Sequence, residues 1–446
     1  MKNKIFESKV VDYTHDGKGI IKYDGYPLFV KGTIIGEMVE TKIVKWKKKY
    51  GFGRALSIKE KSLERVVPLC LDYKLCGGCQ IQHMSYNEQI SFKKKKITNA
   101  FAKQKINFDY INIIENENQF NYRNKLSIPL GVADEIYAGL YQENSNNIIK
   151  INDCLIQSES INSALKDIVK LLNEYQISIY DKSNNKGYLR QLVIREAISS
   201  GDLLIGFVIN SKKYNGELDN VIEKMKCISN IKSIVVNFNC EKNNVILGKK
   251  SQVVYGDGYI IDNVNGKSFR ISLTSFYQVN TIQMNNLYNK AIEMAQLNCN
   301  DIVFDAYCGV GTISIYLASN VKKVVGVDIV ESSIRDANIN MELNKISNIE
   351  FICNDVGVFM KKQTNNFDCV FLDPPRKGCS QEFLEDLINI NPNKVVYISC
   401  DVATQARDIR YLIDNGYSIS EQCAVDMFSQ THHVENIILL TKVHCK

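Results

Sequence analysis

From about residue 270 to the end of the chain, short apolar runs alternate with longer segments of helical periodicity. This alternation predicts an α/β domain built on a parallel sheet, because parallel strands need a crossover, which is usually a helix. The carboxyl ends of such strands meet at one edge of the sheet and form a ligand crevice. The predicted strands are residues 303–305, 323–328, 351–355, 369–373 and 395–400.

The first 60 residues show a different pattern, in which short apolar runs are separated by turn signals such as Asp16-Gly17 and Asp24-Gly25. This spacing predicts a small all-β barrel. Residues 120–265 mix strand and helix patterns, which is typical of an α+β domain. We therefore expect three domains, and their ranges are 1–60, 61–268 and 269–446.

The composition of the 446-residue chain is 45% hydrophobic and 23% charged, as in soluble globular proteins with more than one core. No apolar stretch has the length of a signal peptide or a bilayer span. We therefore expect a cytoplasmic monomer that does not contact a membrane. Thiols stay reduced in the cytoplasm, so the 14 cysteines are candidates for metal ligation or catalysis rather than disulfides.

Positive charge is concentrated in the first hundred residues, although the net charge of the chain is only +6. Residues 42–49 and 93–96 are both rich in lysine, and Trp46, Tyr50 and Phe52 lie in or beside the first segment. Lysines beside exposed aromatic rings suit phosphate contacts and base stacking, so nucleic acid is the expected partner. The alternative is a solvated lysine-rich face without a ligand.

Cys400 follows the apolar run Val395-Val396-Tyr397-Ile398-Ser399 directly. A thiol at the carboxyl end of a strand faces the ligand crevice and can act as a nucleophile. The alternative is a small buried apolar residue without a chemical role.

A glycine-containing loop at residues 305–313 follows the first predicted strand, and Asp328 ends the next strand. Gly309 and Gly311 allow a tight turn, and Asp328 can accept hydrogen bonds from ribose hydroxyls. The third glycine of a dinucleotide fingerprint is absent, because Ser314 occupies that region. The pattern therefore favours an adenosine without a diphosphate, such as S-adenosylmethionine (SAM), over a glycine turn that binds nothing.

Asp373-Pro374-Pro375-Arg376 ends the fourth predicted strand, and residues 425–436 precede a final apolar strand. Together with Cys400 and residues 275–280, these segments resemble the motif set of the RNA uracil-5 methyltransferase family. Uracil C5 is a weak nucleophile until a thiolate adds at C6, and the resemblance implies that Cys400 is this thiolate. It also implies that Glu435 removes the C5 proton. The implied cofactor contacts are Gln278, Tyr307, Asp328, Asp355 and Asp373, the last of which could hold the substrate instead.

Each of these residues also has a structural alternative: Glu435 as a surface acid, Gln278 as a helix cap, and His432 or His433 as a satisfied polar side chain. Two positions depart from the family pattern, since Asp401 replaces a common asparagine and Ser429 a frequent proline. An acid beside the thiol should raise the Cys400 pKa unless Asp401 is turned away or bonded elsewhere. We expect Ser429 to change the loop geometry slightly.

Cysteines are clustered in the segment Cys70-x5-Cys76-Gly-Gly-Cys79, and Cys154 follows much later. Four thiols suit either zinc or an iron–sulfur cluster. The spacing resembles the 23S rRNA branch of the family, which implies a 4Fe-4S cluster held by these four cysteines. Zinc and unligated thiols are also compatible with this spacing.

The whole chain is similar to the rRNA branch of this family, in which the N-terminal barrel is a TRAM domain and the C-terminal domain a Rossmann-like class I methyltransferase. The implied product is 5-methyluridine in 23S rRNA, and the alternative substrate is the tRNA T-loop uridine. Aromatic and arginine groups in residues 120–125 and 187–195 could contact this RNA. Three rival functions are an amino-group methyltransferase, a cytosine-5 RNA methyltransferase and a non-catalytic iron–sulfur RNA-binding protein.

Overall fold

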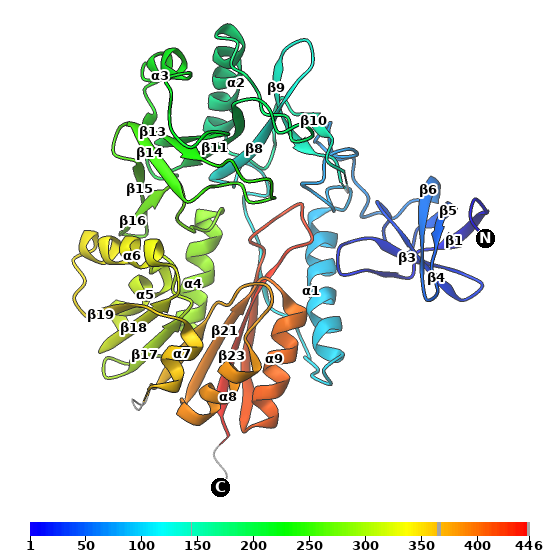
Figure 1. Cartoon of the computed structure of the whole chain (residues 1–446). Coiled ribbons are helices and arrows are strands. Elements are labelled where there is room, and N and C mark those ends of the chain that lie inside the picture. Colours follow the sequence, from blue (N-terminus) through cyan, green and yellow to red (C-terminus); the bar gives the residue numbers. More distant parts are fainter. Residues whose placement is uncertain (144, 364–366, 444–446) are drawn as a thin grey trace.

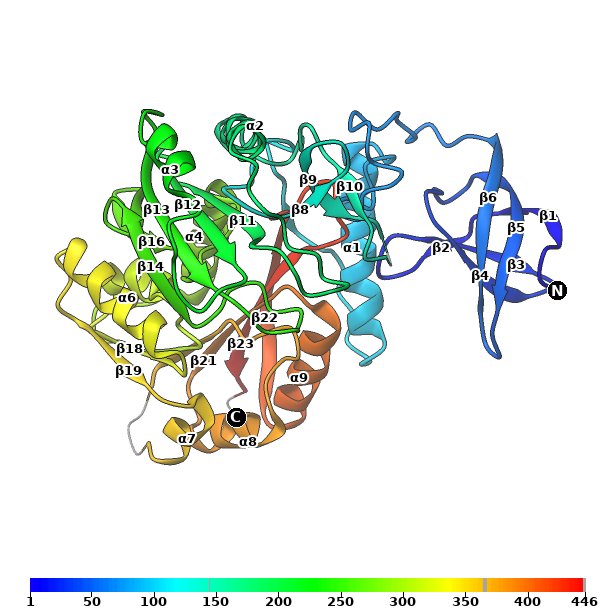
Figure 2. The same cartoon turned by 45° about the horizontal axis from the view of Figure 1, so that its top comes forward.

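A computed structural model describes residues 1–143, 145–363 and 367–443. These residues form sheets of six, seven, two and eight strands. The N-terminal sheet stands to one side of the body, which contains the other sheets (Figures 1 and 2). None of the helices within the described ranges is both long and apolar enough to cross a membrane.

The N-terminal sheet has the strand order β1-β5-β6-β4-β3-β2. Val10, Ile21, Leu28, Val39 and Ile43 form its core, which agrees with the alternation of apolar and polar residues in this segment. The β-strands predicted for this segment are present, whereas the closed barrel and the TRAM assignment stay predictions. The strands are β1 (Ile5–Lys9), β2 (Asp12–Tyr13), β3 (Gly19–Tyr23), β4 (Tyr26–Val30), β5 (Met38–Trp46) and β6 (Gly51–Glu60).

The seven-stranded sheet has the order β10-β9-β8-β11-β12-β13-β14, and two helices pack on one of its faces. Side chains on its other face, such as Val193 and Leu204, belong to the core of the C-terminal domain. The two domains therefore share a core. The elements are β8 (Lys125–Val132), β9 (Ile136–Tyr141), β10 (Ile148–Lys150), α2 (Glu159–Glu174), β11 (Leu189–Glu196), β12 (Leu203–Ile209), α3 (Asp219–Met225), β13 (Ile231–Phe238) and β14 (Lys250–Tyr255).

The eight-stranded sheet has the order β19-β18-β17-β20-β21-β23-β22-β7, and apolar clusters cover both of its faces. All five predicted strands are present, and their shared parallel direction is confirmed. The elements are α4 (Thr281–Ala295), β17 (Ile302–Ala306), α5 (Thr312–Leu317), η1 (Ala318–Asn320), β18 (Lys323–Asp328), α6 (Glu331–Leu343), β19 (Ile349–Cys353), α7 (Val356–Lys361), β20 (Cys369–Leu372), α8 (Gln381–Ile390), β21 (Lys394–Ser399), α9 (Val402–Asp414), β22 (Tyr417–Val425) and β23 (Glu435–Lys442).

Two elements from before residue 120 also belong to this C-terminal unit. Helix α1 (Tyr86–Ala102) packs beside α9, and strand β7 (Ile113–Ile114) pairs with β22. Buried Ile90, Ile97 and Phe101 attach α1 to the core of the sheet. A hairpin of β15 (Tyr259–Val264) and β16 (Lys267–Ser272) crosses the expected boundary at residue 269. The expected boundaries stay a prediction, but residues 86–114 pack with the last domain in space.

Candidate active site

Four of the five expected cofactor residues lie at the carboxyl ends of neighbouring parallel strands. Tyr307 follows β17, Asp328 ends β18, Asp355 caps α7 just after β19, and Asp373 follows β20. Gln278 comes from the segment before α4, where it is nearly buried and hydrogen-bonds to Tyr288. The helix cap at this point is Asn280, not Gln278.

The backbone of the glycine loop after β17 allows a ligand or a neighbouring side chain to approach it closely. Gly311 adopts a positive φ of 79°, and a Cβ there would lie 2.5 Å from the ring of Phe351. Gly309 faces open space, since a Cβ at this position would meet no atom within 4 Å in the described part of the chain. Its amide N–H donates to Asp328 Oδ2 at 3.1 Å, and the Val330 amide donates to the other oxygen at 2.8 Å. Asp328 therefore also orders the loop.

Asp305 is a fully buried acid beneath this loop that the sequence interpretation did not single out. Burial raises its pKa to about 7, although the Ser314 hydroxyl donates to Oδ2 at 2.5 Å. Its other oxygen has no hydrogen-bond partner among the described residues. An unpartnered buried carboxylate oxygen and the neighbouring acids suit a cationic ligand, and the sulfonium of SAM is such a group. Its only signal in the sequence is an acid inside an apolar strand.

Glu435 lies beside Cys400 because the last strand of the chain runs antiparallel to its neighbours. In the register of β21 and β23, Ser399 is opposite Asn436. The first residue of β23 therefore lies at the edge where β21 ends. The structure thus brings Cys400 and Glu435 together with Asp373, although 34 intervening residues separate the thiol from the second acid.

The charges at this edge influence one another strongly. Burial and, to a smaller extent, Asp373 raise the pKa of Glu435 to about 8, although Arg376 lowers it. Burial also raises the pKa of Asp373 to about 7. For the Cys400 thiol, burial and then Glu435 raise the pKa to about 11, while the guanidinium of Arg376 lowers it and hydrogen-bonds to the sulfur. Arg376 is therefore the cation that favours a thiolate here.

Asp401 does not act on the thiol in the way that its position in the sequence suggested. Its carboxylate caps α9 and accepts hydrogen bonds from the amides of Ala403 and Thr404 at 3.0 and 3.1 Å. The acid that follows the nucleophile is therefore bonded to the helix rather than directed at the sulfur.

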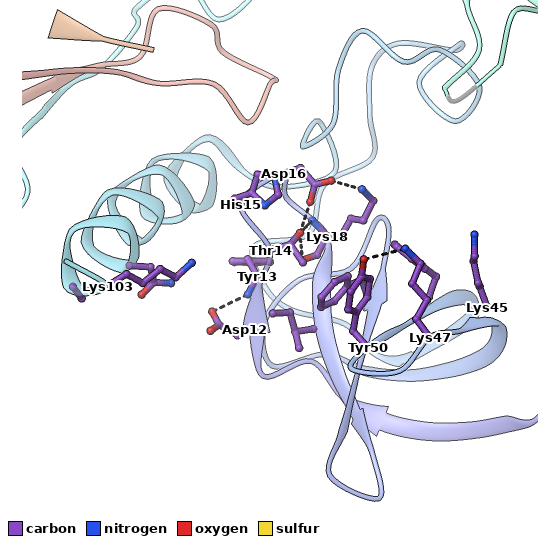
Figure 3. A pocket seen from close by; sticks show the side chains of 15 residues that line it. Asp12, Tyr13, Thr14, His15, Asp16, Lys18, Lys45, Lys47, Tyr50 and Lys103 are labelled. Carbon is purple, nitrogen blue, oxygen red and sulfur yellow. Dashed lines mark hydrogen bonds and ion pairs between the residues drawn. The ribbon is translucent and has the colours of Figure 1, made fainter. Parts of the chain in front are cut away.

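Cys400 opens into a cavity of about 560 Å³ whose wall includes Lys96, Arg376, His432 and His433. A second cavity of about 1130 Å³ lies between the N-terminal sheet and α1, and both cavities share lining residues such as Tyr13 and Asn99. In Figure 3, Lys103, directly after α1, lies on one side of this second cavity, and Lys45, Lys47 and Tyr50 lie on the other. The two cavities form one groove that leads from the N-terminal sheet to Cys400.

The expected stacking role of Trp46 does not match this groove. Trp46 stacks on Tyr26 with ring centroids 3.8 Å apart, and it is not among the residues of the cavity wall. Phe29, Tyr50 and Phe52 line the groove instead, and the Lys47 ammonium lies 4.8 Å from the Tyr50 ring centroid.

The two lysine-rich segments also differ in how many of their lysines line the groove. Lys45 and Lys47 line the groove, as does Lys96 at its inner end. Lys93 is fully buried in an ion pair with Asp426, and Lys95 pairs with Asp12 at 2.9 Å. Only part of the run 93–96 can therefore meet a polyanion.

Some side chains predicted to contact RNA, in residues 120–125 and 187–195, are buried and cannot do so. For these side chains the prediction is wrong. Arg195 is 1% exposed and donates to the carbonyls of Ser272 and Ser275, at 2.7 and 2.6 Å. The buried Tyr122 donates to the Ser429 carbonyl at 3.0 Å. Aromatic and arginine side chains in a sequence do not reveal which face of a strand they occupy.

The four candidate metal-ligating cysteines, Cys70, Cys76, Cys79 and Cys154, line one cavity of about 400 Å³. The Gly78 amide donates to Cys76 Sγ at 3.3 Å. No group of three or more His, Cys, Asp or Glu side chains in the described ranges could hold a metal ion. The expected iron–sulfur cluster is therefore not confirmed, although its four thiols surround a common space.

Comparison with known proteins connects this geometry to a family. The family described as tRNA (Uracil-5-)-methyltransferase matches residues 85–443. An uncharacterized RNA methyltransferase of Staphylococcus aureus (strain N315) is 41% identical over 447 residues, which is 98% of each chain. The chain belongs to this methyltransferase family. A further relative in Clostridium tetani, also an uncharacterized RNA methyltransferase, is 40% identical and covers 99% of this chain and 97% of its own.

A solved structure extends the family relationship over the whole chain. It is the Pyrococcus abyssi tRNA (uracil-54, C5)-methyltransferase in complex with S-adenosyl-L-homocysteine. The two chains are 26% identical with a TM-score of 0.80, and the match covers 98% of this chain and 99% of the other. The chain is thus an RNA uracil-5 methyltransferase that uses SAM.

Proposed function

We propose that this enzyme converts one specific uridine of 23S rRNA to 5-methyluridine through a covalent bond between Cys400 and uracil C6. The observation that carries the proposed chemistry, as distinct from the choice of RNA, is the meeting of Cys400, Glu435 and Asp373 at the edge where the glycine loop also lies. A nucleophile, a base and a cofactor site are then within reach of one pyrimidine ring.

In the first step the Cys400 thiolate adds to C6, and the ring electrons move onto C5 and O4. The Arg376 guanidinium favours the thiolate that this step requires. A uridine in folded RNA has to leave its stack to reach the sulfur, and the 560 Å³ cavity has room for the extruded nucleotide.

When bound, SAM supplies an electrophilic methyl group for C5. We assign its binding to Gln278, Tyr307, Asp328, Asp355 and Asp373, with buried Asp305 beneath the glycine loop. The Glu435 carboxylate then removes the proton from C5, the C5–C6 double bond forms again, and the electron pair of the C6–S bond returns to Cys400. Because burial raises the pKa of Glu435 to about 8, this carboxylate is a stronger base than an exposed one.

The groove beside the N-terminal sheet suits single-stranded RNA next to the target uridine. Tyr50 and Phe52 offer stacking surfaces, and Lys47 and Lys103 offer phosphate contacts. We assign this sheet as the TRAM domain on that basis.

We assign a 4Fe-4S cluster to the cavity lined by Cys70, Cys76, Cys79 and Cys154. Four thiols around a space larger than a single ion suit a polynuclear centre. Methyl transfer from SAM needs no electron donor or acceptor. The role of the cluster is therefore to hold this segment in its fold. Iron content and visible absorption, compared between the protein and Cys79→Ser, test the assignment.

A tRNA T-loop uridine is the second candidate substrate. The tRNA enzyme of Pyrococcus abyssi matches 98% of this chain, so the presence of the N-terminal sheet does not by itself favour rRNA. The rRNA proposal is supported by the cysteine spacing alone.

The test incubates the protein with labelled SAM and either 23S rRNA or tRNA, and maps the product. We expect 5-methyluridine at one rRNA position. Label on tRNA uridine supports the second candidate, and label on a nitrogen overturns the proposed chemistry. In parallel, Glu435→Gln should accumulate a denaturation-resistant, methylated complex with RNA, whereas Cys400→Ala should form none. A complex formed by Cys400→Ala would contradict the assignment of the nucleophile.

A further inference from the structure

The loop that connects β22 to β23, residues 426–434, is held by helix α1 from far away in the sequence. Figure 1 shows a red loop rising above the sheet beside the upper part of α1. His432 and His433 of this loop line the Cys400 cavity, and Glu435 follows it directly. The position of this loop therefore affects both the shape of the Cys400 cavity and the position of Glu435.

The main attachment is the buried ion pair of Lys93 and Asp426, both 0% exposed. The Lys93 ammonium also donates to the Phe428 carbonyl at 3.1 Å. The Tyr86 and Ser429 hydroxyls donate to Asp426 Oδ2 at 2.9 and 2.7 Å. The Asp426 carboxylate thus accepts from three side chains, two on α1 and one in the loop itself.

This attachment lies next to the base. Asp426 directly follows Val425, and Val425 is the ladder partner of Glu435. Fixing the Asp426 side chain therefore holds the end of the ladder that carries Glu435. Cys400 depends less on this attachment, since it lies between β21 and α9, and the neighbouring Asp401 is held by its hydrogen bonds to the first turn of α9.

Further hydrogen bonds hold the tip of the loop on the same helix. The side chains of Gln89 and Gln430 bond to each other at 3.0 Å, and Lys96 donates to the His432 carbonyl at 2.8 Å. Lys96 and Asn99 of α1 also line the cavity. One helix therefore lines the cavity and also holds the loop whose histidines line it.

Buried ion pairs are a weak source of stability, because removing two charges from water offsets most of their attraction. Their directional bonds do fix one arrangement of the groups around them. Ser429, one of the two residues that depart from the family pattern, adds a hydroxyl to this arrangement, which a proline could not provide.

We propose that Lys93, Asp426 and Ser429 are positioning residues for the proton-abstraction step, acting by holding the ladder end that carries Glu435. This inference rests on the proposed role of Glu435 as the base. It predicts that loosening the loop slows the breakdown of the Cys400 adduct more than its formation.

The test measures both steps in single turnovers of the full-length protein with its RNA substrate and labelled SAM. Lys93→Met should slow adduct breakdown roughly tenfold or more, because small misplacements of a reacting group have effects of this size. Formation of the adduct should change less than about twofold, so the denaturation-resistant complex accumulates. Lys94→Met is the matched control, since Lys94 bonds to Tyr110 away from the cavity, and it should change neither step.

Equal slowing of both steps, or no slowing of either, overturns the proposal. If Lys93→Met does not fold, Ser429→Ala and Tyr86→Phe provide the test. Each removes a hydroxyl that donates to Asp426 and accepts from Asn116, and leaves the ion pair intact. They should slow breakdown roughly two- to fivefold, with the same selectivity. If neither variant does so, the proposal fails.

Glu435→Gln in the same assay separates this proposal from the proposed function. If Glu435→Gln accumulates the adduct and the loop variants do not, only the positioning role is wrong. If Glu435→Gln accumulates none, the assignment of the base itself is wrong.

Discussion

Cys400 and the four-cysteine cavity place the same side chain in two different environments. Burial raises the pKa of Cys400 to about 11 and that of Cys79 to about 12. After burial, Cys79 is influenced mainly by Cys154, Cys76 and Cys70, whereas Cys400 faces two carboxyl groups and one guanidinium. A thiol with its own cation and a nearby base is equipped for reaction, while thiols that face one another are equipped to share a ligand.

The largest difference is expected between a substitution of Cys400 and a substitution of Cys79 in the four-cysteine cavity. Cys400→Ala should lower methylation by about a thousandfold or more, because the nucleophile is removed, and should leave the melting temperature nearly unchanged. Cys79→Ser should lower the melting temperature and retain adduct formation. Methyl incorporation and thermal unfolding check both variants. Loss of the adduct in Cys79→Ser at full stability would remove the distinction between the sites.

The pH dependence should identify which carboxyl serves Cys400. Burial raises the pKa of Glu435 to about 8, and only the ionised form can remove a proton. The rate of adduct breakdown should therefore rise about tenfold per pH unit below pH 8 and become level above it. In Glu435→Gln this rise should disappear. A profile that is level from pH 6 to 9 in the unaltered enzyme would contradict the role of Glu435.

Removal of the Arg376 guanidinium should make Cys400 less reactive, like the thiols of the four-cysteine cavity. Arg376→Gln should raise the Cys400 pKa further and slow its alkylation by iodoacetamide at pH 8 about three- to tenfold. Peptide mapping by mass spectrometry measures the rate at each cysteine. Arg410→Gln is the control, because Arg410 pairs with Asp414 on α9. Equal rates in both variants would show that Arg376 does not act on the sulfur.

The smallest effect is expected at Asp401. Asn caps helices as well as Asp does, so Asp401→Asn should change the free energy of unfolding by no more than about 0.5 kcal/mol. Alkylation of Cys400 should change less than about twofold, because the Asp401 carboxylate is directed to the amides of α9. Several-fold faster alkylation would mean that this acid does oppose the thiolate. Chemical denaturation and peptide mapping provide the two measurements.

The sequence alone predicted the features that depend on local pattern. The five strands of the C-terminal sheet follow from apolar runs, and the third is displaced by only two residues, to Ile349–Cys353. Cys400, Asp328 and Asp373 lie at strand ends as expected, because parallel strands present their carboxyl ends at one edge. The family resemblance through Cys400 and residues 425–436 also came from the sequence, and the family match over residues 85–443 confirms it.

Other features were decided only by the tertiary structure. Lys93 looked like part of a polyanion-binding run, yet it is buried against Asp426, 333 positions away. Trp46 was the expected stacking surface, but it packs on Tyr26, while Tyr50 lines the groove. Local pattern determines which segments become strands and helices. Which side chains then meet depends on strand register and on the packing of distant elements, and these follow from the burial of the whole core.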